Sequence, residues 1–333
     1  MSTTAMGNAI HDIAPTTHFQ TQTRTCPQLL KVIIFTSIVI YYTFHCKQGS
    51  PFLTNFSWSL ALTFSSAKFL KMSETGSIKR GAQLAEGKTK IIYAVEGDDS
   101  ICIVYSKDRI TAHNAVRSNE LEGKAAISTR TAASVFGLLT DAGVRNHFVR
   151  LESEREFIAE RCAMIPIEFV TRRVATGSFL KRNHNVKEGF RFSPVKSEYF
   201  YKDDAAGDPE WSFEDVVSAE MVMGGKKITA DDVEMMSQTS VCVFEILEKA
   251  WASIDCALID MKIEFGVNSQ DIIDSDSWRL WPSGDRRLMK DKQVYRDLPE
   301  VTKEALQEVK RNFEWIADKL NVIPARNTFS VLL

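Results

Sequence analysis

The segment "TRRVATGSFLKR", residues 171–182, combines four cationic side chains with hydroxyl groups and one glycine. An arginine presents a planar fork that binds a phosphate or carboxylate through two parallel hydrogen bonds. Small residues such as Thr176, Gly177 and Ser178 allow backbone N–H groups to approach an anion closely. We therefore interpret Arg172 and Ser178 as parts of an anion-binding cradle. The alternative is a solvated surface loop.

Carboxylates are concentrated in and just after the segment "DMKIEFG", which contains Asp260 and Glu264 and precedes Asp271. A hairpin centred on Val267–Asn268 would place Glu264 and Asp271 opposite each other on one side. Two opposed carboxylates repel each other unless a cation binds between them. Because these are hard oxygen ligands without His or Cys nearby, the pattern indicates Mg²⁺. The alternative is a strand in which Lys262 forms salt bridges.

A short lysine-rich segment, "EGKTK" at residues 86–90, is not a Walker A motif, because Gly81 lies one residue too far from Gly87. The β-branched residues after it indicate a strand, where Walker A requires a helix. A glycine between strands, followed by Lys88 and Lys90, suits a lid over nucleotide phosphates, as in kinase-like folds. The alternative is a turn with solvated lysines.

Further cations follow near the C-terminus of the folded part. Arg279 lies between Trp278 and Trp281, in a segment that we predict to be a loop. Lys292 and Arg296 are four residues apart and would share one face of a helix. Tryptophans beside an arginine favour a binding pocket over a solvated surface.

The elements that position these residues can be predicted from hydrophobic periodicity and turn residues. Strands at 88–95 and 100–106 form a hairpin, and "FIAERCAMIPIEFVTRRVA" contains two strands interrupted near Pro166. The strand "CALIDMKIEFG" alternates charged and apolar residues. Helices are predicted at residues 127–142, after the capping box Thr229–Asp232, and at 301–320. The fold class is therefore α+β.

Composition narrows the class of protein. The 333 residues are 44% hydrophobic with a net charge of −2, which does not suggest nucleic acid or an acidic membrane as a partner. Six scattered cysteines indicate reduced thiols in a cytoplasmic protein. The apolar run 32–46 would span only about 22 Å as a helix, less than a bilayer core. We interpret residues 1–71 as an extension outside the fold, and the alternative is membrane association through residues 32–46.

Two long segments, "MIPIEFVTRRVATGSFLKR" and "ALIDMKIEFG", resemble the two motifs of the SAICAR synthetase family. "SKDRITAHNA", "EGKAAIS", "YKDDAAGDPEW" and "DSDSWRLWPSGDR" agree with this family as well. The similarity runs from about Leu84 to Leu320, and it is greatest to the N-terminal part of the animal bifunctional enzyme. The resemblance implies a two-lobed fold, with a sheet-rich ATP lobe at residues 72–165 and a larger mixed lobe at 166–321.

The same resemblance implies an ATP-dependent ligase that joins CAIR, a carboxylated aminoimidazole ribonucleotide, to L-aspartate, giving SAICAR, ADP and phosphate. By motif matching, ATP would contact Gly87, Lys88, Lys90 and Met164. Mg²⁺ would be held by Glu264 and Asp271. CAIR would be held by Arg172, Ser178, Arg279, Lys292 and Arg296. Catalytic roles would fall to Asp260, Lys262 and Lys202. A homo-oligomer is compatible with the sequence.

The chain departs from the family pattern in several places. The hairpin between Glu264 and Asp271 is shorter, so the metal ligands would be held less firmly. His113 occupies a position where the family usually has glycine. Residues 322–333 diverge and no carboxylase domain follows, so we expect no carboxylase activity. The shortened hairpin leaves open a catalytically impaired isoform that binds nucleotide or partner subunits. A kinase is disfavoured because H-R-D and D-F-G segments are missing.

Overall fold

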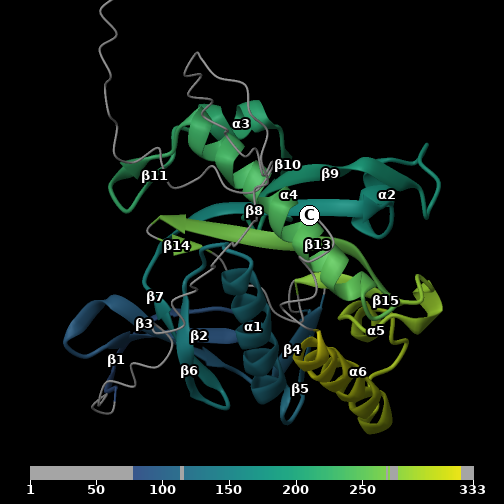
Figure 1. The fold of residues 1–333 in the computed structure, drawn as a ribbon, viewed down its shortest axis with the longest axis horizontal. Coiled ribbons are helices and arrows are strands. Elements are labelled where there is room, and N and C mark those ends of the chain that lie inside the picture. Colours follow the sequence, from purple (N-terminus) through teal and green to yellow (C-terminus); the bar gives the residue numbers. More distant parts are fainter. Residues whose placement is uncertain (1–77, 113–115, 268, 271–276, 324–333) are drawn as a thin grey trace, which may run out of the picture. The chain divides into compact units, whose positions relative to one another are not determined.

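The computed structural model describes residues 78–112, 116–267, 269–270 and 277–323. Within these ranges the chain forms two large antiparallel sheets and two short strand pairs, with helices packed against the large sheets, so the predicted α+β class is confirmed (Figure 1). His113, Asp271 and the apolar run 32–46 lie outside the described residues. Across the described part of the chain, no helix is long and apolar enough to span a membrane.

The first sheet has five strands in the order β1-β2-β3-β7-β6. Their bounds are β1 Arg80–Glu86, β2 Lys90–Val95, β3 Asp98–Ser106, β6 Phe148–Ser153 and β7 Glu156–Glu160. A separate pair consists of β4 Arg109–Ala112 and β5 Arg117–Glu120. The predicted hairpin is confirmed, since β2 pairs with β3 and the glycine of the connecting turn has φ of 84°. This sheet positions the Gly87–Thr89 turn between β1 and β2.

The predicted first helix is present as α1, Lys124–Asp141, and begins three residues earlier than expected. It starts directly after Gly123, whose φ of 86° allows the chain to turn sharply into the helix. Val135, Phe136 and Leu139 are buried along its inner face, in contact with the first sheet (Figure 1).

The second sheet follows the order β10-β9-β8-β13-β14, and β15 also pairs with β13. Its strands are β8 Ala163–Val174, β9 Arg191–Tyr201, β10 Glu210–Trp211, β13 Cys256–Val267, β14 Ser269–Gln270 and β15 Trp278–Pro282. The shorter elements are α2 Ser178–Arg182, α3 Phe213–Ser218, β11 Val222–Met223, β12 Lys226–Lys227, the 3-10 helix η3 Arg286–Leu288 and α5 Gln293–Arg296. The predicted boundary between lobes, after residue 165, falls inside β8.

The strand break predicted near Pro166 is wrong. β8 continues through Pro166, and the break lies at residues 161–162 instead. The register between β8 and β13 shifts at this point, because Glu168 faces Glu264 whereas Met164 faces Gly266. A bulge of this kind accommodates a residue that lacks a backbone N–H. The carbonyl of Pro166 still accepts a hydrogen bond from the Lys202 N–H at 3.0 Å.

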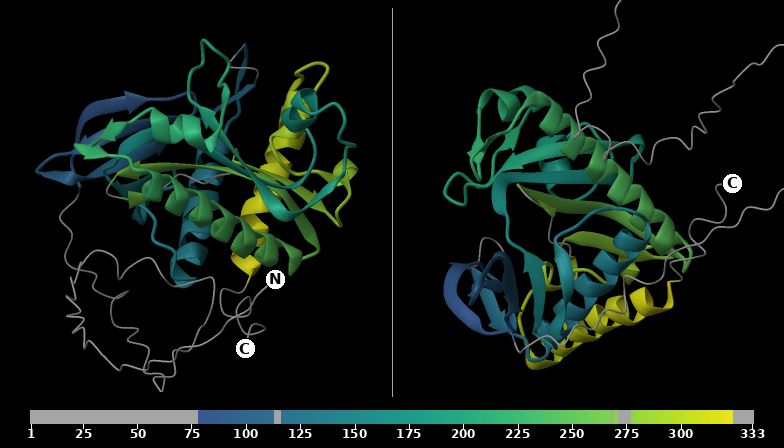
Figure 2. Two further views of the ribbon diagram at one scale, coloured as in Figure 1. Left: turned by 90° about the horizontal axis from the view of Figure 1, so that it is seen from above. Right: turned by 60° about the vertical axis from the view of Figure 1, so that its left-hand side comes forward.

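The two faces of the second sheet differ in character. Helix α4, Ala230–Ala252, runs across one face and starts at the predicted capping box of Thr229 and Asp232 (Figures 1 and 2). On that face Phe169 packs edge-on against Phe265, and the Tyr199 hydroxyl bonds Ser237 of α4 at 2.9 Å. Since side chains alternate along a strand, the neighbouring residues of β8, β9 and β13 point to the opposite face. That opposite face carries the charged residues.

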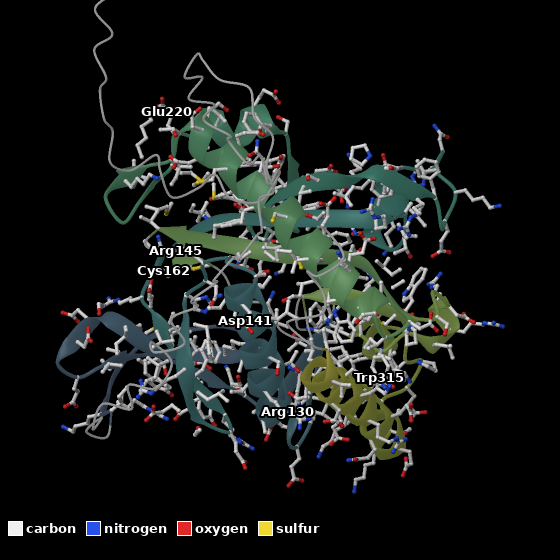
Figure 3. All side chains as sticks on the ribbon, viewed as in Figure 1. Arg130, Asp141, Arg145, Cys162, Glu220 and Trp315 are labelled. Atoms are coloured by element: carbon white, nitrogen blue, oxygen red, sulfur yellow. The ribbon has the colours of Figure 1, made fainter. Side chains whose placement is uncertain are left out.

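Helix α6, Lys303–Val322, confirms the last predicted helix and packs against α1. Arg130 of α1 forms an ion pair with Asp318 of α6 at 3.0 Å, and Trp315 of α6 stacks on Trp251 of α4 (Figure 3). Helix α6 therefore contacts both α1, which packs on the first sheet, and α4, which packs on the second.

Candidate active site

The centre of the charged face is a buried cluster of two arginines around one carboxylate. Asp260 of β13 lies opposite Arg172 on β8 and opposite Arg279 on β15, its two neighbouring strands. Its Oδ2 accepts a hydrogen bond from Arg172 Nη1 at 2.6 Å and another from Arg279 Nη1. The Asp260 carboxylate raises the pKa of the Arg279 guanidinium above its ordinary value. The hydrogen bonds to Asp260 therefore hold both guanidinium groups in place, and the raised pKa keeps Arg279 charged.

Arg279 does not lie on a loop, as predicted, but within strand β15. The flanking Trp278 and Leu280 are buried at 4% and 0% exposure, and this alternation with Arg279 is that of a strand. The prediction was wrong because two tryptophans and a proline in five residues hide this period. Pairing with β13 places Arg279 beside Asp260.

Above the cluster lies the start of α2, which contributes Ser178 and Gly177. The Ser178 hydroxyl is 3.5 Å from Arg172 Nη2 and is exposed, whereas Arg172 itself is only 3% exposed. Gly177 has φ of 59° and ψ of −131°, and a Cβ there would lie 2.7 Å from Arg279 Nη2. Only glycine allows the backbone to approach this guanidinium so closely. The segment that the sequence singled out thus joins the arginine cluster.

A second charged group lies farther along β13, where Lys262 and Glu264 meet Glu168 of β8 and Lys202, which follows β9. Lys262 Nζ bonds Glu168 Oε1 at 2.7 Å and Glu264 Oε1 at 3.1 Å. Lys202 Nζ bonds the other oxygen of Glu264 at 2.7 Å. The salt bridges of Lys262 that the sequence offered as the alternative are therefore present, and the site roles of these residues stay predictions. Glu168, which sequence reasoning did not single out, belongs to this group because it lies directly opposite Glu264.

The charges in this group stabilise one another. Burial disfavours the ionised form of Glu264, but the ammonium groups of Lys262 and Lys202 hold its pKa below the ordinary value. Burial alone would lower the pKa of Lys262, yet the carboxylates of Glu264 and Glu168 raise it. At neutral pH, Lys262 is an ammonium group and cannot act as a proton acceptor.

The hairpin after β13 has the centre that we predicted. Gly266 faces Ser269 and Phe265 faces Gln270, and this register agrees with the predicted centre. The described part of the return strand β14 has two residues. Asp271 lies outside the described residues, and its role as a metal ligand stays a prediction. No cluster of three His, Cys, Asp or Glu side chains suited to a metal occurs among the residues that the structure describes.

The predicted nucleotide lid is the tight turn between β1 and β2, closed by a 2.9 Å hydrogen bond from Gly87 N–H to the Lys90 carbonyl. Lys88 Nζ reaches Asp204 Oδ1 at 2.8 Å. Because Asp204 follows Lys202 by two residues, this ion pair connects the turn to the loop that carries the Lys202–Glu264 pair. Met164 lies near the start of β8, is 41% exposed and faces Gly266.

Lys292 and Arg296 lie at the two ends of α5, and Arg296 Nη1 is 3.3 Å from Gln293 Oε1. The neighbouring Asp291 fixes this helix to β15, because its carboxylate accepts hydrogen bonds from the backbone N–H groups of Leu280 and Gln293 at 2.9 and 2.8 Å. Burial raises the pKa of Asp291 despite these hydrogen bonds. The helix therefore begins beside the strand that carries Arg279.

Most of the predicted site residues fall into two hydrogen-bonded networks. Arg172, Ser178, Asp260 and Arg279 make one connected network, and Lys202, Lys262 and Glu264 make another on the same face of the sheet. Sequence reasoning missed Glu168 and Glu198, which hold Lys262 and Arg172 in place. Their signal was an acidic residue alternating with aromatic and β-branched neighbours in "IEFV" and "SEYFY".

Several known proteins are similar to this chain. A family model described as SAICAR synthetase matches residues 83–313. The chain is 53% identical over 262 residues to a Drosophila melanogaster protein named bifunctional phosphoribosylaminoimidazole carboxylase/phosphoribosylaminoimidazole succinocarboxamide synthetase, covering 77% of this chain and 61% of that protein. It is 47% identical over 244 residues to the phosphoribosylaminoimidazole-succinocarboxamide synthase of Herpetosiphon aurantiacus, covering 72% of this chain and 96% of that protein. The match spans 59–61% of the length of the Drosophila and Gallus gallus relatives.

Solved structures show the same fold. A phosphoribosylaminoimidazole-succinocarboxamide synthase from Ehrlichia chaffeensis matches with a TM-score of 0.64 and 29% identity, over 73% of this chain and 100% of that one. A SAICAR synthetase described as a complex with ADP matches with a TM-score of 0.60 and 28% identity, over 69% of this chain and 96% of that one. From these matches and the geometry of the charged face, the chain belongs to the SAICAR synthetase family.

Proposed function

We propose that this chain is an ATP-dependent ligase of purine biosynthesis that joins the carboxylate of CAIR to the amine of L-aspartate, giving SAICAR, ADP and phosphate. Family membership supports the reaction. The observation that carries the proposal is the charged face of the second sheet, where two fixed arginines lie beside an exposed serine and near a lysine–glutamate group. The buried thiols of Cys102 and Cys256 accord with a cytoplasmic location.

The reaction explains why cations gather in a chain of nearly neutral charge. A carboxylate is a poor electrophile, so the γ-phosphoryl group of ATP is first transferred to the CAIR carboxylate, giving an acyl phosphate and ADP. The aspartate amine then attacks the acyl carbon, phosphate leaves with the C–O bonding electrons, and the nitrogen loses a proton. Each reactant is an anion, so the site must offset repulsion among several negative charges.

We assign the CAIR anions to Ser178 and Arg279, with Arg172 supporting them from below. Asp260 contributes by accepting a hydrogen bond from each arginine, which offsets the repulsion between their guanidinium groups. Lys292 and Arg296 are the further candidates for contacts with CAIR, because α5 begins beside the strand of Arg279.

For ATP, we assign the phosphates to the β1–β2 turn with Gly87, Lys88 and Lys90, and the base to the backbone near Met164. The Lys88–Asp204 ion pair supports this assignment, because it brings the turn to the loop that bears Lys202. Lys88 of the turn and Lys202 of the loop each contact an acidic partner that a triphosphate would compete with or join.

Glu264 has the donor chemistry that Mg²⁺ prefers, since its carboxylate oxygens are ionised and partly exposed, with Glu168 on the facing strand. We assign Mg²⁺ to Glu264 and Asp271. When bound, the ion supplies neutralisation of the charge on the phosphates. Lys202 and Lys262 would stabilise the same negative charge from beside Glu264.

The test is an ADP-release assay on the full chain with ATP, Mg²⁺, CAIR and L-aspartate, each omitted in turn. We expect turnover that requires all four. ADP release without aspartate would indicate that the acyl phosphate forms and is hydrolysed. A folded protein that releases no ADP under any of these conditions would refute the proposal.

A further inference from the structure

The most deeply buried carboxylate of the charged face belongs to Glu198 of β9, whose side chain is 0% exposed. Its Oε2 accepts a hydrogen bond from Arg172 Nε, and its Oε1 accepts one from Arg182 Nη2 at 2.5 Å. Both oxygens are therefore occupied by arginines. A carboxylate is costly to bury unless it is hydrogen-bonded and paired in this way, so the two arginines offset the cost of burying Glu198.

The strand register explains why Glu198 reaches Arg172. Glu198 lies opposite Val170 on β8, two residues before Arg172, and therefore shares the face opposite to α4. Glu198 accepts the hydrogen bond of Arg172 Nε. The other two nitrogens of the guanidinium are then directed elsewhere, Nη1 at Asp260 and Nη2 at Ser178. The orientation of the guanidinium plane is thus determined from both sides.

The second arginine extends this network to the backbone of the cradle. Arg182 Nη1 donates to the carbonyl of Ser178 at 3.2 Å, and its Nε donates to Glu210 at 2.6 Å. The Glu198 carboxylate therefore holds the Arg172 guanidinium directly and, through Arg182, the short helix α2 that carries the Ser178 hydroxyl.

We propose that Glu198 is a positioning residue for CAIR: it does not touch the substrate but orients Arg172 and the start of α2, so that the cradle presents Ser178 and Arg279 to the CAIR anions. This inference rests on the proposed function. It predicts that loss of the Glu198 charge weakens CAIR binding selectively and leaves the ATP side of the reaction intact.

The test is Glu198→Gln in the full chain, which keeps the size of the side chain but removes its charge. The amide can accept a hydrogen bond from only one arginine and directs its NH₂ group at the other. We expect KM for CAIR to rise about tenfold, the effect of one weakened charge-assisted hydrogen bond, with KM for ATP unchanged. Calorimetric titration with CAIR should show the same loss of affinity.

Glu248→Gln is the matched control. Glu248 of α4 binds Arg173, the neighbour of Arg172, through two hydrogen bonds of 2.7 and 2.8 Å on the opposite face of the sheet. This variant loses a comparable arginine pair on the same strand, and we expect its KM for CAIR to match wild type. Glu198→Asp keeps the charge with a shorter reach, and we expect an intermediate KM for CAIR.

The outcomes separate the inference from the proposed function. Wild-type protein that neither binds CAIR nor turns it over overturns both. Active wild type with an unchanged KM for CAIR in Glu198→Gln overturns the positioning role alone. Equal rises in KM for CAIR and for ATP, or an equal rise in the Glu248 control, would show a general structural effect and also overturn it. If Glu198→Gln does not fold, Glu198→Asp decides, and a wild-type KM in that variant is the refuting result.

Discussion

Gly177→Ala tests directly whether close backbone approach to Arg279 is needed for the cradle. The glycine has φ of 59° and ψ of −131°, a region that residues with a Cβ rarely adopt. The added methyl carbon would lie 2.7 Å from Arg279 Nη2 and 3.1 Å from its Cζ. Arg279 cannot move away freely, because it is bonded to Asp260 and its side chain is only 15% exposed.

Two separate costs follow from this geometry. Backbone strain at a non-glycine residue in such a region amounts to about 1–3 kcal/mol of stability. If the added methyl group pushes Arg279 aside, the CAIR anions that we assign to Arg279 are displaced with it. A misplacement of about 1 Å reduces the rate on the order of 10²-fold, which corresponds to about 2.7 kcal/mol of transition-state stabilisation.

The assay compares kcat/KM for CAIR and the thermal midpoint of Gly177→Ala with those of Gly97→Ala. Gly97 also has positive φ, 84°, but a Cβ there meets nothing within 4 Å. The control therefore has backbone strain without the clash. We expect its thermal midpoint to fall by about 2–4 °C for each kcal/mol of stability that the strain costs. We expect kcat/KM for CAIR to fall about 100-fold in Gly177→Ala and to stay near wild type in Gly97→Ala. Equal kcat/KM in the two variants would show that the approach to Arg279 is irrelevant to the cradle.

Three further outcomes follow from the structure. Because the pKa of Glu264 lies below its ordinary 4.5, its ion pairs stabilise the fold above that pH and cease to do so as pH falls through the folded pKa. Urea denaturation should therefore show that Glu264→Gln is less stable than wild type by about 1 kcal/mol at pH 7, and this difference in stability should disappear in acid. A difference that does not depend on pH would contradict this. Thr229→Ala removes the capping box that Thr229 forms with Asp232 and should cost about 1 kcal/mol, whereas Thr229→Ser should not; an equal loss in both would exclude the cap as the cause. Burial raises the pKa of Cys102 to about 11 and that of Cys256 to about 12, so both thiols stay protonated at neutral pH. Replacing either cysteine with alanine should not change the number of thiols in the native chain that react quickly with a thiol reagent, and loss of one such thiol would contradict their burial.

Local sequence patterns predicted most elements correctly where one physical signal dominated. The capping box marked the start of α4, and the alternation in "CALIDMKIEFG" assigned Asp260 to the face opposite Ile259 and Met261. Prediction failed where neighbouring strands decide the local structure. Pro166 lies inside β8 because a bulge against β13 accommodates it, and Arg279 lies in a strand because β13 provides its pairing partners.

The candidate site shows the same division. Lys262 and Glu264 could be identified as a charged pair because they are two residues apart on one strand. Their partner Glu168 is 94 residues away from Lys262, and no local period links the two. Glu198 could not be identified for the same reason, because a single acidic residue in an aromatic strand does not reveal which cations it will meet.

The sequence by itself determined the family, the alternation that separates the charged face from the apolar face, and the residue types able to bind anions. These depend on short-range spacing, which a chain carries before it folds. Tertiary structure alone decided that Asp260 lies between Arg172 and Arg279, and that Glu198 lies beneath Arg172. Such contacts depend on the order and register of strands β9, β8, β13 and β15, which are set by the packing of the whole sheet against α4.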